Sequence, residues 1–238
     1  MAKTAPYQQI SEALRSEICA EYNPGQFLPS ESVLAERFAV NRHTVRRALD
    51  VLSQEGLVLR RQGRGTMVLG RLIDYRIAEK TRFTESIEAE GMSPAGDLMD
   101  KGWRVPPPEA AQALGVELGE MVVWIEQRRR ADDLPIVVSS HYLPPSFGWL
   151  VDEFSGGSLH AAILGRTGQR LRQMETTVLA SVPTTQDAAA LFAPSKVPIL
   201  TVAACNVDVR TDEPVEYFIG RFRADAVKFR FMPGEQPD

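Results

Sequence analysis

Arginines gather between residues 41 and 71 in a pattern suited to binding phosphate groups. This stretch holds seven arginines against two acidic residues, Asp50 and Glu55. Residues 73–238 carry 17 basic and 24 acidic residues, and the whole chain has a formal charge of −4. A solvated cationic helix face is an alternative explanation for residues 42–47 taken alone. Because the arginines are concentrated in an otherwise acidic chain, we favour a phosphate-binding surface and a nucleic acid partner.

The first of these arginines are expected on a helix that begins after Asn41 and stops at Gly56. Asn41 is a favourable N-cap, and apolar residues recur at helical spacing behind the basic ones. The candidate DNA-binding residues at this helix start are Asn41, Arg42, Thr44, Arg46 and Arg47. A helix with a basic N-terminus is suited to enter a major groove of DNA.

A glycine hairpin follows the helix and carries a further cation at its tip. The β-rich runs LVLRR and TMVL flank Gln62, Gly63, Arg64 and Gly65. Such a tip can contact the DNA backbone or the minor groove. Two helices are expected before the basic one, over residues 7–20 and after the N-cap Ser30. Together these elements predict a winged helix-turn-helix.

Composition excludes several classes of protein. No apolar run approaches the roughly 20 residues that span a bilayer, and the N-terminus lacks the apolar core of a signal peptide. A cytoplasmic protein is therefore expected. The two cysteines and three histidines show no metal-ligand spacing, so neither a metal nor a cofactor is predicted.

The run LPSESVLAERFAVNRHTVRRALDVLSQEGLVLRRQGRGTMV resembles the DNA-binding domain of GntR-type bacterial transcription regulators. The resemblance covers nearly all of residues 7–70, and it implies a palindromic double-stranded operator bound by a homodimer. It also implies that Arg42, Thr44 and Arg46 touch bases or phosphates, and that residues 62–64 enter the minor groove. Ser32 departs from the family, which often has a DNA-contacting arginine there.

A second domain is expected beyond Leu72, so the predicted boundaries are 1–72 and 73–238. Residues 70–75 look like a linker, and the pattern then becomes α+β, with sequential antiparallel hairpins and short helices. We expect a helix capped by Thr84, a strand opened by Trp103, and a hairpin formed by residues 121–130 and 134–143. Alternation on the first hairpin strand places Gln127 and Arg129 on one face and Arg128 and Arg130 on the other.

Two helix starts and a strand arginine together favour an anion site in this domain. Free N–H groups at a helix start carry partial positive charge, and Thr84 or Ser158 would add a hydroxyl. Arg129 on a nearby strand could then pair with a phosphate or phosphonate through two hydrogen bonds. Taken singly, each of these residues is an ordinary N-cap or surface arginine.

This second part is similar to the ligand-sensing (UTRA-type) domain of the HutC branch of GntR regulators, which has a chorismate lyase-like fold. The shared markers include the F-T-E helix start, the strand with Arg129, the G-S-L helix start and the pair Glu216–Tyr217. The resemblance implies no enzymatic activity. The candidate effector-binding residues are Arg82, Thr84, Gln127, Arg129, His141, Ser158, Glu216 and Arg223.

The overall likeness is to branch members associated with phosphonate uptake and degradation genes, which implies a repressor controlled by a small anion. Two alternatives remain: a regulator that senses a sugar phosphate or a histidine-pathway acid, and an enzyme on the lyase-like fold. Gln127 and Ser139 stand where an arginine and a glutamate are expected in sugar-phosphate sensors. The sequence offers no nucleophile–base pair, metal set or carboxylate pair for catalysis.

Overall fold

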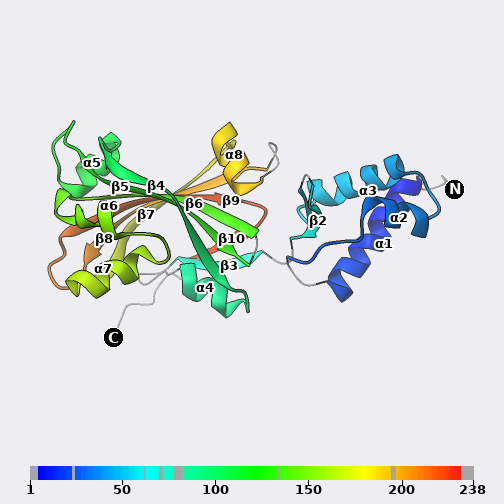
Figure 1. The fold of residues 1–238 in the computed structure, drawn as a ribbon, viewed down its shortest axis with the longest axis horizontal. Helices are drawn as coiled ribbons and strands as arrows, with labels where there is room; N and C mark the ends of the chain where they lie inside the picture. Colours follow the sequence, from blue (N-terminus) through cyan, green and yellow to red (C-terminus); the bar gives the residue numbers. More distant parts are fainter. Residues whose placement is uncertain are drawn as a thin grey trace. The chain divides into compact units, whose positions relative to one another are not determined.

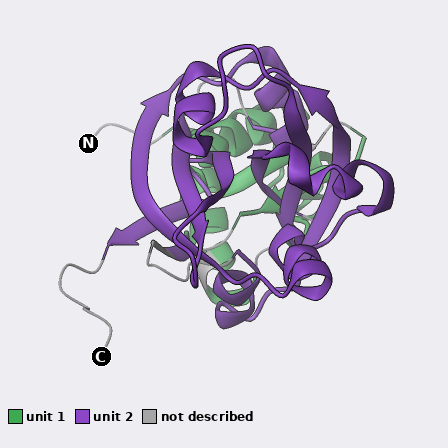
Figure 2. Cartoon of the chain, turned by 90° about the vertical axis from the view of Figure 1, so that its left-hand side faces the viewer, with its two compact units in different colours: residues 1–72 green, residues 73–238 purple. Residues whose placement is uncertain are grey.

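The computed structural model describes residues 5–22, 25–61, 63–69, 72–77, 83–132, 134–193 and 197–231. The chain divides into two compact units, Met1–Leu72 and Ile73–Asp238, which are coloured separately in Figure 2. The candidate residues Gln62 and Arg82 lie outside the described ranges.

The described part of the N-terminal unit forms helices followed by a hairpin (Figure 1). Its elements are α1 (Pro6–Glu21), α2 (Glu31–Arg37), α3 (Arg42–Gln54), β1 (Val58–Arg61) and β2 (Gly65–Val68). The hairpin strands are antiparallel, and Phe27 forms an isolated bridge to Met67 in β2. Leu14 of α1 and Leu49 and Leu52 of α3 are fully buried in one core. Since α3 packs through this apolar stripe, its polar side stays outside the core.

Local sequence signals set the ends of α2 and α3. Ser30 Oγ accepts a hydrogen bond from the Val33 amide at 3.4 Å, and Asn41 Oδ1 accepts one from the Thr44 amide at 2.8 Å. Beyond α3, Gly56 adopts a left-handed φ of 73°, which a residue with a side chain would resist. The predicted caps and the predicted stop are therefore present.

Replacing Asn41 by Ala is expected to destabilise α3 by about 1 kcal/mol, because the Thr44 amide loses its acceptor at the helix start. Amide hydrogen exchange of α3 in the full chain measures this as faster local opening. Asn41→Asp keeps an acceptor and is the matched control. Equal exchange in the alanine and aspartate variants would contradict the capping role.

A six-stranded antiparallel sheet organises the C-terminal unit, in the order β4-β5-β6-β9-β8-β7. Its strands are β4 (Pro94–Arg104), β5 (Val122–Ala131), β6 (Leu134–Leu143), β7 (Leu171–Ser181), β8 (Ile199–Asp208) and β9 (Pro214–Arg223). The fold is α+β, as predicted. In Figure 2 the strands of this unit curve strongly.

Helices cover both faces of the sheet (Figure 1). Those described are α4 (Phe83–Ala89), α5 (Pro108–Leu114), the 3₁₀ turn η1 (Pro145–Phe147), α6 (Trp149–Glu153), α7 (Leu159–Thr167) and α8 (Thr185–Leu191). Apolar side chains of α6 and α7 pack with Val123 and Ile125 on one face, on the side where α4 also lies. α5 packs on Val122 and Trp124, and α8 on Val138, on the opposite face.

The predicted linker at residues 70–75 is wrong over its second half. Ile73–Ile77 forms β3, which pairs in parallel with β10 (Val227–Phe231) from the end of the chain. Ile73 and Tyr75 are buried, and Asp74 binds Lys228 at 3.3 Å and Arg230 at 2.5 Å. Pairing across about 150 residues leaves no local sequence signal, and it also means that not every strand pair in this unit is antiparallel.

The expectation that Trp103 opens a strand is also wrong, since β4 begins at Pro94 and Trp103 lies near its end. The segment PAGDLMDKGWR contains Pro, Gly and Asp, which strands disfavour. Pairing with β5 overrides this local preference at the edge of the sheet. Across the described residues of both units, no helix is long and apolar enough to cross a membrane.

Candidate functional site

The basic helix start predicted for the N-terminal unit is present at the surface. Arg42, Arg46 and Arg47 are exposed on α3. Arg46, with 55% of its side chain exposed, binds Glu31 of α2 at 2.9 Å, and Arg47 lies 4.1 Å over the ring of Tyr7. The hydrogen bond from Arg46 holds the pKa of Glu31 below its ordinary value. Because exposed ion pairs contribute little to stability, Arg46 can exchange Glu31 for a phosphate or a base at small cost.

The remaining candidates differ in their availability. Thr44 Oγ1 lies 3.0 Å from Asn41 Oδ1, so its hydroxyl takes part in the helix cap. At the hairpin tip, Gly63, Arg64 and Gly65 are exposed, and the two glycines have φ values of 76° and 106°. The left-handed backbone allows the tight turn that carries Arg64.

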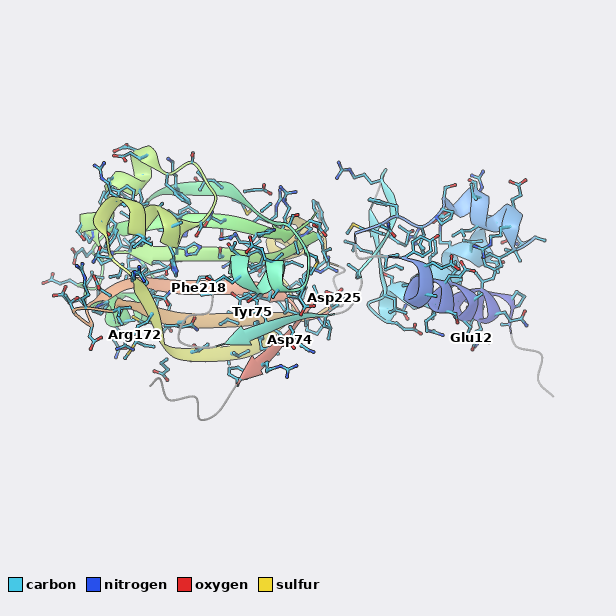
Figure 3. All side chains as sticks on the ribbon, turned by 90° about the horizontal axis from the view of Figure 1, so that it is seen from below. Glu12, Asp74, Tyr75, Arg172, Phe218 and Asp225 are labelled. Carbon is cyan, nitrogen blue, oxygen red and sulfur yellow. The ribbon has the colours of Figure 1, made fainter. Side chains whose placement is uncertain are left out.

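A cavity of about 440 Å³ opens on the face of the sheet covered by α4 and α7. Four of the predicted effector residues line it: Thr84, Arg129, His141 and Ser158. Aromatic side chains from three elements share the lining, among them Tyr75 of β3, Phe83 of α4 and Phe218 of β9. Figure 3 labels Tyr75 and Phe218 in the body of this unit.

Arg129 is the cation best placed in the cavity. Its Nη2 donates to Thr84 Oγ1 at 3.2 Å, and its guanidinium lies 4.7 Å over the ring of Phe83. Its Nε is buried and has no hydrogen-bond partner among the described residues. Burial lowers the pKa of Arg129, but a guanidinium remains charged at neutral pH. A buried donor without a partner is costly, so the site is suited to an anion that would accept from it.

The start of α7 adds further donors. Ser158 is its N-cap, and Ser158 Oγ accepts from the Ala161 amide at 3.3 Å. First-turn N–H groups have no partner within a helix and attract anions. The prediction that Thr84 caps the other helix is wrong, because α4 begins at Phe83 and places Thr84 inside it. Thr84 instead contributes its side-chain hydroxyl, which holds Arg129 in place.

A buried carboxylate anchors the other polar part of the cavity wall. Glu216 is fully buried and is contacted by His141 Nδ1 at 2.5 Å, His160 Nε2 at 2.6 Å and Asn206 Nδ2 at 2.6 Å. His141 Nε2 lies 2.9 Å from Ser139 Oγ. Burial tends to raise the pKa of Glu216, but the charges and hydrogen bonds of the two histidines outweigh it and lower the pKa. We call these five residues the Glu216 cluster.

Three predicted effector residues do not line the cavity. Gln127 is buried and donates to the Gly157 carbonyl at 2.9 Å, and Glu216 lies behind the two histidines. The prediction that Arg223 binds the effector is wrong. Arg223 is fully buried, but it binds Asp225 at 2.7 Å and the Leu191 carbonyl at 3.3 Å, so it supports the end of the sheet rather than a ligand.

The cluster also contains residues that are not among the predicted effector-binding residues, namely Ser139, His160 and Asn206. Ser139 and His141 are two positions apart on β6, so strand alternation alone puts both on one face. That spacing could have revealed the contact between them, which has the form of a nucleophile–base pair. Ser139 is 2% exposed in the middle of a strand, so we assign it to holding His141. His160 and Asn206 carry no comparable signal.

The fold should lose stability in acid through Glu216. Its pKa is lower in the fold than its ordinary value, so the unfolded chain binds the proton more readily. The stabilisation is complete above the ordinary glutamate pKa and declines as the pH falls below it. Between about pH 5 and pH 3, urea midpoints of the natural chain should fall more steeply than those of Glu216→Gln. Parallel curves would contradict this.

Two family models match the chain, one in each unit. Residues 6–68 match the bacterial regulatory proteins of the gntR family, and residues 89–228 match the UTRA domain. The chain is 34% identical to the probable transcriptional regulator PhnF of Escherichia coli, over 94% of this chain and 93% of that protein. It is 37% identical to the HTH-type transcriptional repressor NagR of Bacillus subtilis, over 58% and 57% of the two chains.

A solved structure shows the same architecture. The crystal structure of PhnF from Mycobacterium smegmatis matches with a TM-score of 0.65 and 27% sequence identity. The match covers 95% of this chain and all of that one. The likeness therefore extends over both units and not over a single domain.

Proposed function

Since the chain belongs to the GntR family of bacterial transcription regulators with a UTRA domain, we propose that it is a homodimeric repressor of phosphonate-utilisation genes controlled by a small anion. As a member of this family it is a DNA-binding regulator with an effector-binding domain. We assign DNA binding to residues 1–72 and effector binding and dimerisation to residues 73–238. The protein acts in the cytoplasm, where its DNA lies.

The exposed face of α3 supports the assignment of the DNA contacts. We place α3 in a major groove, with Arg42 and Arg46 at base edges or phosphates. Asn41 and Thr44 fix the helix start through their cap, and Arg47 is available beside them. Gly63, Arg64 and Gly65 carry the hairpin tip to the adjacent minor groove. Two copies would read a palindrome with half-sites about one helical turn apart.

The buried Nε of Arg129, which has no hydrogen-bond partner among the described residues, is the observation that carries the effector assignment. Thr84, Ser158 and the first turn of α7 supply further donors around the same cavity. A tetrahedral oxyanion has enough acceptor oxygens to satisfy these groups at once. His141 completes the lining from β6.

The phosphonate assignment follows the similarity to PhnF over both units. Gln127 is engaged with the Gly157 carbonyl and does not line the cavity, and Ser139 is held against His141. Two positions expected to be charged in sugar-phosphate sensors therefore offer no charge here. This favours a small anion over a sugar phosphate, which is the alternative effector.

A thermal-shift series on the full chain tests the assignment. An effector that binds the folded state raises the melting temperature, by an amount set by its concentration relative to its Kd. We expect methylphosphonate and phosphate to stabilise the protein more than glucosamine 6-phosphate at equal concentration. Stabilisation by the sugar phosphate alone would contradict the phosphonate assignment. No stabilisation by any anion would contradict the anion site itself.

A further inference from the structure

Carboxylates lie beside the cations in the described lining of the cavity. Among the described residues, the lining contains the cations Arg129 and Arg170 and, from α4, the carboxylates Glu85 and Glu88. Glu216 adds a third negative charge behind His141 and His160. A doubly charged anion would bring further negative charge close to these carboxylates. A proton taken up by the histidine pair would offset one of those negative charges.

We propose that binding of a doubly charged tetrahedral oxyanion in this cavity is accompanied by proton uptake at His141 and His160 of the Glu216 cluster. This inference rests on the proposed anion effector and deepens it. The protonation of the two histidines would then decide which ligand charge the cavity prefers. The affinity for a dianion would rise as the pH falls through the neutral range.

The hydrogen bonds around His141 accommodate both of its protonation states. When His141 is neutral, Nδ1–H donates to Glu216 and Nε2 accepts from the Ser139 hydroxyl. When His141 is protonated, Nε2–H donates to Ser139 Oγ. The Ser139 hydroxyl can then donate to the Gln127 carbonyl, which lies 3.4 Å from Ser139 Oγ. Rotation of one hydroxyl therefore suffices for the change.

His160 links the Glu216 cluster to the cavity. Its side chain is 35% exposed, lines the cavity and reaches Glu216 through Nε2. It also lies in the first turn of α7, next to the N-cap Ser158 that we assign to anion binding. A dianion there would place negative charge on one side of the imidazole, with Glu216 on the other. Both favour the imidazolium form.

The other charged groups near the cluster do not replace the histidines. Arg129 is held by Thr84, and burial raises the pKa of Tyr75, so that this phenol stays neutral. At the end of β8, Asp208 is paired with Arg210. Arg170, Glu85 and Glu88 also belong to the charged lining among the described residues.

Calorimetric titration of the full chain with sulfate tests the proposal. Sulfate remains a dianion throughout the neutral range, so its own protonation does not contribute. Binding heats in buffers of different ionisation enthalpy should show net proton uptake near pH 7. The association constant should rise as the pH falls, by up to about tenfold per pH unit for one proton.

Substitutions identify the residues that take up the proton on anion binding. His160→Gln should lower the uptake and flatten the pH dependence, and Glu216→Gln should do the same, because the buried charge that stabilises an imidazolium is lost. His43→Gln removes the remaining histidine of the sequence, on α3, and should leave both unchanged. Uptake retained in both His160→Gln and Glu216→Gln would overturn the assignment.

The outcomes separate this proposal from the proposed function. Sulfate or methylphosphonate binding whose affinity does not change between about pH 6 and pH 8.5 would overturn the proton uptake and leave the anion effector in place. Failure of both anions to bind at any pH would overturn the two together.

Discussion

Replacing Arg42 and Arg46 together by alanine is expected to weaken operator binding by about 2–6 kcal/mol, since each contact contributes about 1–3 kcal/mol. Both side chains are exposed at the start of α3, and the ion pair of Arg46 with Glu31 can be exchanged. Fluorescence anisotropy with an operator selected from random DNA measures the change. If the arginines contact phosphates, the salt dependence of binding should also fall by about one unit of slope per lost contact.

Arg37 provides the matched control for this experiment. It also lies in the N-terminal unit, has 47% of its side chain exposed and pairs with a carboxylate, that of Glu17. It belongs to neither α3 nor the hairpin tip. Arg37→Ala should therefore leave operator affinity nearly unchanged. Equal losses of operator affinity in the control and the double variant would indicate that the overall positive charge of the unit, rather than a recognition helix, governs binding.

Replacing Arg129 by alanine should weaken anion binding by about 1.5–3 kcal/mol, roughly 10–150-fold, because the cavity loses a buried charged donor. Calorimetric titration with methylphosphonate measures this loss. Arg129→Lys keeps a charge but not the forked guanidinium, so it should recover part of the affinity.

The neighbouring Arg128 is a control on the same strand. Its side chain lies on the opposite face of the sheet and binds Asp97 at 2.9 Å. Arg128→Ala should bind the anion with the affinity of the natural chain. If the Arg128 and Arg129 variants lose affinity equally, the loss reflects damage to β5 and the cavity assignment is wrong.

Local signals in the sequence predicted much of this molecule. Asn41, Ser30 and Gly56 set helix ends through contacts within a few residues. The helices of the N-terminal unit could therefore be predicted from their caps and their apolar periodicity. Strand alternation separated Arg129 from Arg128 correctly, because a side-chain period of two holds wherever a strand is regular. The family resemblance of both units is confirmed by the two matching models.

Distant pairings were not predictable in the same way. The pairing of β3 with β10 and the early start of β4 depend on partners elsewhere in the chain. The contact of His160 with Glu216 joins residues 56 positions apart, and it forms because α7 packs over the sheet. Arg223 was predicted to bind the effector, whereas its position on β9 directs it to Asp225.

We propose that an anion bound in the cavity controls how tightly α3 binds DNA. The most direct test is the operator affinity of the full chain, measured with and without saturating methylphosphonate. Coupling between the sites of about 1–3 kcal/mol predicts a 5- to 150-fold weakening with the anion bound, and Arg129→Ala should show little of it. An operator Kd that is the same at every anion concentration, under conditions where the anion is bound, would contradict the account.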